Sequence, residues 1–577
     1  MASRLTALIV VGIVAVTLVA GLIVGAQRDD DSGPVDLLIV NGRVYPADGS
    51  GTFADAVAIR ANQVLRVGSN RELKRLRGIG TTVIDAHGGA VLPGFNDSHA
   101  HFLAGGLASG SLDLRSATTL EEIEQAVRAY SERHPSDEWI LGRGWRFRAF
   151  PDGLPTRQQL DAVVPDRPVY VVAEDGHTGW ANSRALAEAG ITRRTQNPPH
   201  GSIVKDPRSG EPTGALKDSA RSLIERVLPK PTDDEALDAL RSAIAEAHRH
   251  GITSVQDVDG TADEFDWYDE LRQEDALKVR IYGILGIQPG FGGTAVDRLD
   301  EVLKRFSDDP LLKAGAVRLE VDGSIESHTA AMLAPYANKR TTGHLVFTLD
   351  QLRRLVALLD RRGWQILIDA TGDAAARLSL DALEDAVTTN PTPARGRRHR
   401  VERLEAIDPV DLSRLRASGT IASLQPFRSD VTADPLQVWA ANVGAERASR
   451  GWPWRSIGEA GGRLAFGSDW PAGSLDPLVG LQVAITHGGG QAGEASGHGQ
   501  ALPLITALDA YTRGAAYASF DEQRKGTLAR GMLADLVILS ADIFSLPPER
   551  LSDARVETTI FDGRVVYSRN RTLTIAH

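Results

Sequence analysis

Strand-like apolar runs alternate with helical stretches along most of this chain, and this alternation limits the possible folds more than any other feature. Such repeats are typical of a parallel sheet covered by helices. We expect strands at residues 91–101, 252–257, 279–284, 316–322, 365–369, 399–403, 421–425 and 464–469. Eight strands predict an α/β fold of the (β/α)8 TIM-barrel type, with functional residues at the carboxyl ends of the strands. An insertion over about 113–250 follows the first strand.

The two ends of the chain carry a second, shorter strand pattern. Asn41-Gly42 between alternating apolar residues is the strongest short signal for a β-hairpin. Strand-like runs occur at residues 35–45, 57–60, 63–68, 534–539 and 559–567. Because neither end supplies enough strands for a stable core, we expect one composite β-sandwich from residues 35–90 and 520–577. The barrel would then occupy residues 91–519.

The N-terminus contains a long uncharged stretch. Leu5 to Ala26 is a run of 22 residues without a charge, and about 20 apolar residues are needed to cross a bilayer as a helix. We therefore predict a transmembrane helix within residues 1–34, in a single-pass protein of the cell membrane whose main domain is extracytoplasmic. Cleavage after Val24-Gly25-Ala26 is the alternative, and the protein would then be secreted.

Composition excludes several classes of function. The net charge of −11 over 577 residues argues against a nucleic-acid surface, which would be basic. The chain has no cysteine, so disulfides, thiolate metal ligands and thiol nucleophiles are excluded. The expected partners are a small-molecule substrate and the membrane through the N-terminal helix, with a second copy of the chain as a further candidate.

His99 and His101 end the first predicted barrel strand. Side chains alternate along a strand, so both imidazoles point the same way and form half of a divalent-metal site. This region resembles the first-strand signature of the amidohydrolase superfamily. Further strings resemble its family 3 branch, which includes N-substituted formamide deformylases; they are Gly142-Arg143-Gly144-Trp145, Asp175-Gly176-His177 and Asp322-Gly323-Ser324.

The resemblance implies a barrel hydrolase with one or two metals and assigns roles to several residues. His99 and His101 match the first-strand ligands. Asp469, in Phe466-Gly467-Ser468-Asp469, matches the eighth-strand aspartate, which binds metal and takes a proton from the attacking water. His177 resembles the family's substrate-facing histidine, which can donate to a developing oxyanion.

Three other ligand positions depart from the family pattern. Arg318 stands where a carboxylated lysine belongs, and a guanidinium cannot form that carbamate. Asp369 and Arg403 replace histidines of strands five and six. Asp369 can still bind a metal through oxygen, and it can pair with Arg403. Glu320 shares the strand face of Arg318 and is a candidate replacement ligand. We therefore predict one divalent metal, of the zinc type, held by His99, His101 and Asp469, with Asp369 and Glu320 as further candidates.

Two functions remain open at this point. The first is a metal-dependent hydrolase that acts on a non-peptide carbon–nitrogen bond of a small amide, formamide or cyclic amide. The alternative is a catalytically decayed amidohydrolase-fold protein that binds a ligand or acts as a scaffold in the cell envelope. The fold alone does not decide between them, because one fold supports many functions.

Overall fold

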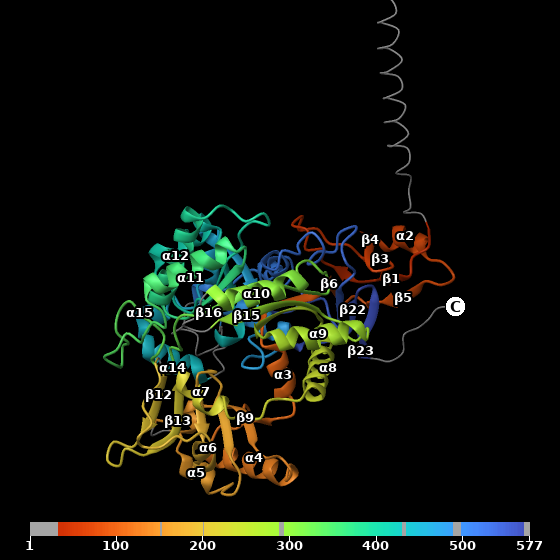
Figure 1. Ribbon diagram of the computed structural model, residues 1–577. Coiled ribbons are helices and arrows are strands. Elements are labelled where there is room, and N and C mark those ends of the chain that lie inside the picture. The colour runs from red at the N-terminus through yellow and green to blue at the C-terminus, as the bar shows by residue number, and fades with distance from the viewer. Residues whose placement is uncertain are drawn as a thin grey trace, which may run out of the picture.

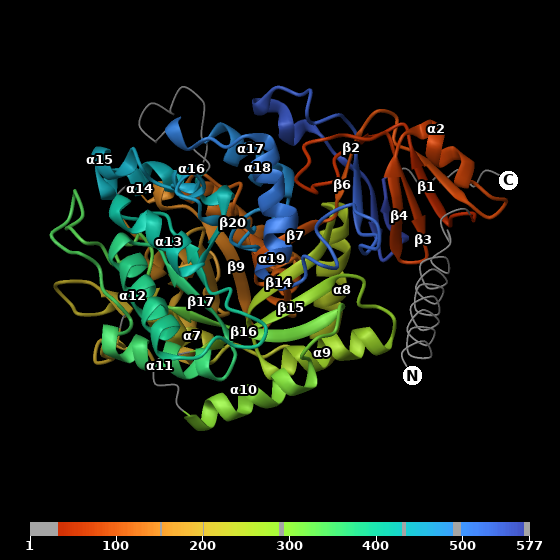
Figure 2. The same cartoon turned by 90° about the horizontal axis from the view of Figure 1, so that it is seen from above.

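The computed structural model describes residues 33–150, 153–199, 201–287, 293–429, 434–487 and 498–569. An eight-stranded parallel sheet, nearly closed into a barrel, forms its centre (Figures 1 and 2). The strands are β7 (Phe95–Ala100), β14 (Ile252–Gly260), β15 (Arg280–Ile287), β16 (Leu312–Glu320), β17 (Gln365–Ala370), β18 (Arg400–Arg403), β19 (Ile421–Leu424) and β20 (Arg463–Phe466). The predicted barrel and its eight strands are confirmed, with strand ends displaced by a few residues.

Amphipathic helices cover the outside of the barrel (Figure 2). In α11 (Leu349–Arg361), Thr348 and Gln351 form a capping box, and Leu352, Leu355 and Leu359 are buried at helical spacing. The other helices on this layer include α8 (Asp233–Arg249), α9 (Ala262–Gln273), α10 (Gly293–Arg305), α12 (Asp373–Thr389), α13 (Leu412–Ser418), α16 (Trp454–Glu459), α17 (Pro477–Thr486) and α18 (Leu504–Asp509).

The barrel closes at the point where β7 meets the end of β20. The backbone N–H of Asp469 donates to the carbonyl of His99 at 2.8 Å. Gly467 allows this approach, because a Cβ there would lie 2.4 Å from the backbone nitrogen of His99. Closure therefore brings the His99 strand beside Asp469.

Strands from both chain ends form two small sheets beside the barrel (Figure 2). One has the order β4-β3-β1-β5 and the other β2-β6-β21-β22-β23, so that the second combines both ends. Their bounds are β1 (Leu37–Val40), β2 (Arg43–Val44), β3 (Ala56–Arg60), β4 (Gln63–Gly68), β5 (Thr82–Asp85), β6 (Ala90–Pro93), β21 (Leu536–Leu539), β22 (Val556–Phe561) and β23 (Arg564–Ser568).

The structure corrects two local predictions in this region. The hairpin at Asn41-Gly42 is wrong, because β1 and β2 belong to different sheets. The Gly42 N–H donates instead to the carbonyl of Asp55 at 2.9 Å. The chain passes from one sheet to the other at this point. The run 91–101 forms two strands, since Gly94 separates β6 from β7 and packs against Thr253.

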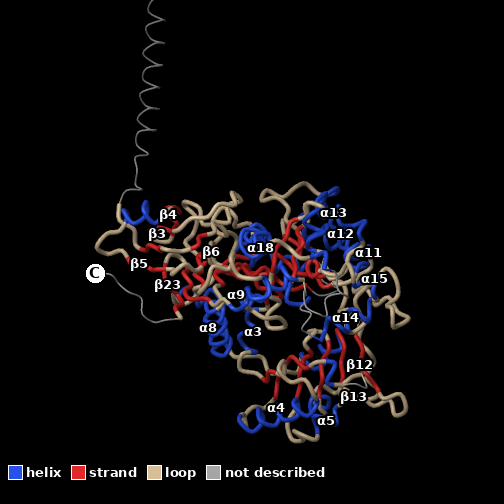
Figure 3. Tube along the Cα trace, turned by 180° about the vertical axis from the view of Figure 1, so that it is seen from behind, coloured by secondary structure: helices blue, strands red, loops and turns tan. Residues whose placement is uncertain are grey.

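A six-stranded sheet lies at one side of the barrel, between β7 and β14 in the chain (Figures 1 and 3). Its order is β12-β13-β11-β10-β9-β8. The strands are β8 (Leu112–Asp113), β9 (Ile140–Trp145), β10 (Val169–Ala173), β11 (Thr178–Ala181), β12 (Gly201–Lys205) and β13 (Pro212–Asp218), and the helices include α4 (Leu120–Arg133), α5 (Arg157–Asp161), α6 (Ser183–Glu188) and α7 (Ser222–Glu225).

The predicted single-pass membrane localisation is contradicted. Over the described parts of residues 33–569, no helix combines the length and apolar character needed to cross a membrane. The stretch Leu5 to Ala26, on which the prediction rested, lies outside the described residues.

Candidate functional site

His99, His101 and Asp469 converge at the carboxyl ends of β7 and β20. One ligand atom from each lies within 4.8 Å of the other two. Asp469 Oδ1 is 3.5 Å from His99 Nε2 and 3.4 Å from His101 Nε2. Two ligands about 2.1 Å from a tetrahedral ion are about 3.4 Å apart. The spacing of these three groups therefore suits a divalent metal.

Two of these ligand atoms are buried without a partner. His99 Nε2 and Asp469 Oδ1 have no hydrogen-bond partner among the described residues, and both side chains are at most 1% exposed. Burying a polar atom without a hydrogen bond is costly. A bound cation would satisfy both atoms at once, so the residues present fit a metal.

Glu402 sets the orientation of the His99 ring. His99 Nδ1 lies 2.8 Å from Glu402 Oε2, and Arg400 Nε donates to the other oxygen of Glu402 at 2.7 Å. Burial raises the pKa of Glu402, but the charge of Arg400 and the bond to His99 outweigh burial and lower it. A carboxylate that accepts from Nδ1–H leaves the Nε2 lone pair of the histidine free for a metal.

Arginines hold the other oxygen of Asp469. Arg428 Nε donates to Asp469 Oδ2 at 2.7 Å, and an Arg403 nitrogen lies 3.8 Å from the same oxygen. Burial raises the pKa of Asp469, but these two cations outweigh it and hold that pKa well below its ordinary value. Asp469 is therefore a carboxylate whose Oδ1 alone remains open toward the two histidines.

Asp369 lies outside the three-residue cluster. Arg403 Nε is 2.9 Å from Asp369 Oδ1, and Arg318 Nε donates to Asp369 Oδ2 at 3.1 Å. Arg318 also contacts Asp259 Oδ2 at 2.5 Å, and this oxygen is 3.6 Å from His101 Nδ1. An ion-paired network of two arginines and two aspartates thus occupies the space beside His101.

The backbone of this network is also unusual. Asp259, Arg403 and Asp469 have φ angles of 62°, 69° and 56°, which place all three in the left-handed region. Non-glycine residues adopt this region rarely, and such residues concentrate at functional sites. All three residues line the pocket at the end of the barrel.

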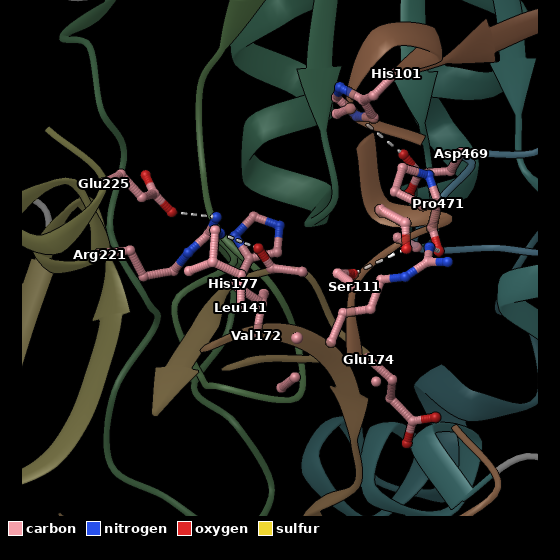
Figure 4. Close-up of a pocket in the computed structure, with 18 of the residues that line it drawn as sticks. His101, Ser111, Leu141, Val172, Glu174, His177, Arg221, Glu225, Asp469 and Pro471 are labelled. Atoms are coloured by element: carbon pink, nitrogen blue, oxygen red, sulfur yellow. Dashed lines mark hydrogen bonds and ion pairs between the residues drawn. The ribbon is translucent and has the colours of Figure 1, made fainter. Parts of the chain in front are cut away.

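His177 lies across the pocket from His101 and Asp469 (Figure 4), and Glu320 also lines this pocket. His177 Nδ1 lies 3.2 Å from Asp218 Oδ1 and 3.8 Å from Glu320 Oε1. The Glu320 side chain is 44% exposed and does not join the metal cluster. With Nδ1 directed to carboxylates, Nε2 is the His177 atom that can reach a ligand.

One pocket of about 530 Å³ is lined by His101 and Asp469 of the candidate metal cluster and by His177 and Glu320. Its walls come from the barrel ends and from β9 and β10 of the inserted sheet, which contribute Leu141 and Val172 (Figure 4). A small molecule would therefore contact apolar surface, the candidate metal ligands and several arginines together.

Four charged residues of the site were not among the predicted site residues. Asp259 lies beyond the predicted end of the second strand, although its alternation with Asp257 was a usable signal. Arg400 and Glu402 alternate on β18 and therefore share one face. Arg428, in the loop after β19, offered no periodic signal, because a loop does not fix the direction of its side chains.

A nearly closed parallel barrel with a His-His-Asp cluster at its strand ends has the architecture of the barrel hydrolases. Residues 82–567 match the model described as the amidohydrolase family, and the chain belongs to this family. The resemblance read from the sequence motifs is thereby confirmed.

Similar proteins span nearly the whole chain. Protein LONG AFTER FAR-RED 3 of Arabidopsis thaliana is 33% identical over 544 residues, which cover 92% of this chain and 91% of that protein. The N-substituted formamide deformylase of Arthrobacter pascens is 25% identical over 553 residues, which cover 92% and 98%. A structure of an uncharacterized metal-dependent hydrolase from Pyrococcus horikoshii matches in fold, with a TM-score of 0.70, 24% identity, and coverage of 89% and 99%.

Proposed function

We propose that this protein is a hydrolase with one divalent metal that breaks a non-peptide carbon–nitrogen bond in a small amide, formamide or cyclic amide. The observation that carries the proposal is the pair of buried atoms, His99 Nε2 and Asp469 Oδ1, that have no hydrogen bond among the described residues and lie beside His101. Two imidazoles and one carboxylate are typical of catalytic zinc, which keeps an open position for water. Zinc is therefore the ion we propose.

Asp469, Arg428 and His177 would have separate roles in the hydrolysis. When bound, a divalent ion supplies Lewis acidity, which lowers the pKa of water toward about 7 and polarises a carbonyl. Arg428 holds Asp469 Oδ2, so Oδ1 is the atom placed to accept a proton from the attacking water. The same oxygen can return that proton to the departing nitrogen as the carbon–nitrogen bond breaks. His177 Nε2 faces the pocket and is placed to contact the carbonyl oxygen.

The altered ligand positions favour one alternative function. In it the catalytic centre has decayed, and the protein only binds a ligand or acts as a scaffold. Arg318 and Arg403 bring permanent cations to positions where the family resemblance implies metal ligands, and both pair with Asp369. Such a protein would keep the pocket but hold no metal.

Metal content and turnover of the full-length chain separate these two functions. We expect about one zinc, manganese or iron per chain by elemental analysis, and release of formate from N-benzylformamide or ring opening of a hydantoin. The double variant His99→Ala/His101→Ala should lose both metal and turnover, whereas the control His134→Ala should keep both. A chain that binds no metal after incubation with excess zinc would support the binding protein instead.

A further inference from the structure

Arg143 is a cation in the wall of the pocket. Asp113 lies opposite it on the neighbouring strand β8, but that carboxylate is ion-paired with Arg115. Arg143 lies on β9, and its Nη1 donates to the carbonyl of Pro471 at 2.8 Å. Its Nε is buried and has no hydrogen-bond partner, and no carboxylate of the described residues lies within ion-pair distance of the guanidinium. Burying a charged group without a partner is costly, so this arginine calls for an anion.

The other arginines that line the pocket are already neutralised. Each has a carboxylate partner, in the pairs Arg115–Asp113, Arg221–Glu225, Arg318–Asp259, Arg403–Asp369 and Arg428–Asp469. These pairs leave Arg143 as the lining arginine that has no ion-paired carboxylate among the described residues. An incoming anion would therefore be attracted to this one place.

The backbone brings a second cation against Arg143. Gly144 has a φ of 86°, and a Cβ there would lie 2.4 Å from Arg115 Cγ. Burial and the charge of Arg115 outweigh the opposing charge of Asp113 and lower the pKa of Arg143 to about 10, which still leaves the guanidinium charged at neutral pH. Glycine at this position thus lets Arg115 lie close to β9 with its partner Asp113, which is therefore not free to pair with Arg143.

The contact of Arg143 with Pro471 connects it to the loop that carries Asp469, one of the candidate metal ligands. Pro471, to which it donates, follows Asp469 by two residues, and both line the pocket (Figure 4). Leu141 and Val172, on β9 and β10, supply apolar wall nearby. A molecule bound to Arg143 through an anionic group can therefore reach the His-His-Asp cluster while its apolar part contacts these strands.

We propose that the substrate is a small amide that carries a carboxylate, and that Arg143 binds this carboxylate and sets the substrate's orientation. This inference rests on the proposed hydrolytic function and adds the class of substrate to it. The guanidinium presents a planar set of donors that matches a carboxylate. A purely structural arginine would only hold the Pro471 carbonyl.

The test compares a carboxylate with its neutral amide. N-acetyl-leucine and N-acetyl-leucinamide are titrated by calorimetry into the zinc-loaded full-length chain. The wild-type chain should prefer the carboxylate by about 10-fold or more, the value expected for hydrogen bonds between charged groups. Arg143→Gln, whose amide can still donate to Pro471, should abolish this preference and leave the neutral probe and the metal content unchanged.

The control is Arg133→Gln, because Arg133 is exposed on α4 and does not line the pocket; the preference should change by at most about two-fold. Equal binding of both probes to the wild type, no binding of the carboxylate at millimolar concentration, or equal weakening of both probes by Arg143→Gln would overturn the inference. Amide hydrolysis is measured separately. A preference that Arg143→Gln abolishes, in a chain without turnover, would refute the proposed hydrolase and leave the anion site standing.

Discussion

Glu402 does not line the pocket, yet it controls which nitrogen of His99 faces the candidate metal. Glu402→Gln keeps the size of the side chain but removes the charge that accepts from Nδ1–H. We expect zinc affinity to fall by about 10- to 100-fold, as is typical for partners that orient a ligating histidine. Competition with a chelating indicator measures the affinity.

The matched control for this prediction is Glu225→Gln. Glu225 lines the same pocket but pairs with Arg221 and has no contact with the cluster. Its variant should bind zinc as the wild type does. If Glu402→Gln also binds zinc with unchanged affinity, Glu402 has no orienting role.

Asp369 limits the number of metals, because both of its oxygens already accept from guanidinium groups. Arg403 contacts Oδ1 and Arg318 contacts Oδ2. A second metal would have to displace these cations, so we expect at most one tightly bound metal per chain by elemental analysis. The combined substitution Arg318→Lys, Asp369→His and Arg403→His should raise occupancy toward two. Two metals in the wild-type chain would contradict this account.

At the scale of elements, His250 joins the end of α8 to the start of α17. Its Nε2 is 3.1 Å from Glu246 and its Nδ1 3.5 Å from Asp476, which caps α17. Burial lowers the pKa of His250, but these two carboxylates outweigh burial and raise it to about 9. The imidazolium therefore links two helices that cover the barrel.

A raised pKa stabilises the folded chain at low pH. The contribution is fully present below the unfolded pKa of about 6.5 and is lost as pH rises through the folded pKa. His250→Gln should therefore lower the free energy of unfolding by about 2 kcal/mol at pH 6, allowing for partial exposure, and by much less at pH 10. Urea denaturation measures both. An equal loss at both pH values would contradict the assignment.

At the scale of the molecule, the C-terminal strands support the strand that carries the metal ligands. β21 pairs with β6, which leads through Gly94 into β7 and His99. Asp535 also forms a buried ion pair with Arg280 of β15, at 2.6 Å. Truncation after residue 520 removes these contacts, so residues 35–90 should become sensitive to limited proteolysis.

A milder variant keeps this prediction testable if the truncated chain does not fold. Asp535→Ala leaves Arg280 buried with one fewer partner and should cost about 3 kcal/mol of unfolding free energy. Asp308→Ala, which breaks an exposed pair with Arg524, should cost less than about 1 kcal/mol. An intact N-terminal region after truncation, or equal effects of the two substitutions, would show that the two ends are independent.

The sequence by itself determined the features that depend on local periodicity. Alternating apolar residues predicted the eight barrel strands, and the two-residue spacing placed His99 and His101 on one face of β7. Family resemblance identified Asp469 and located the departures at Arg318, Asp369 and Arg403. These conclusions need only the residue pattern within a strand and its immediate flanks.

Only the tertiary structure decided which side chains meet. Asn41-Gly42 has the composition of a hairpin, yet hydrogen bonding to Asp55 sends the chain to a second sheet. Asp369 points to two arginines rather than to the histidines, and Glu320 points to His177. Loop-borne Arg428 and the inserted strand that carries Arg143 reach the pocket through contacts between segments far apart in the chain. Periodicity fixes the face of a strand, whereas partners across a barrel depend on register, closure and loop path.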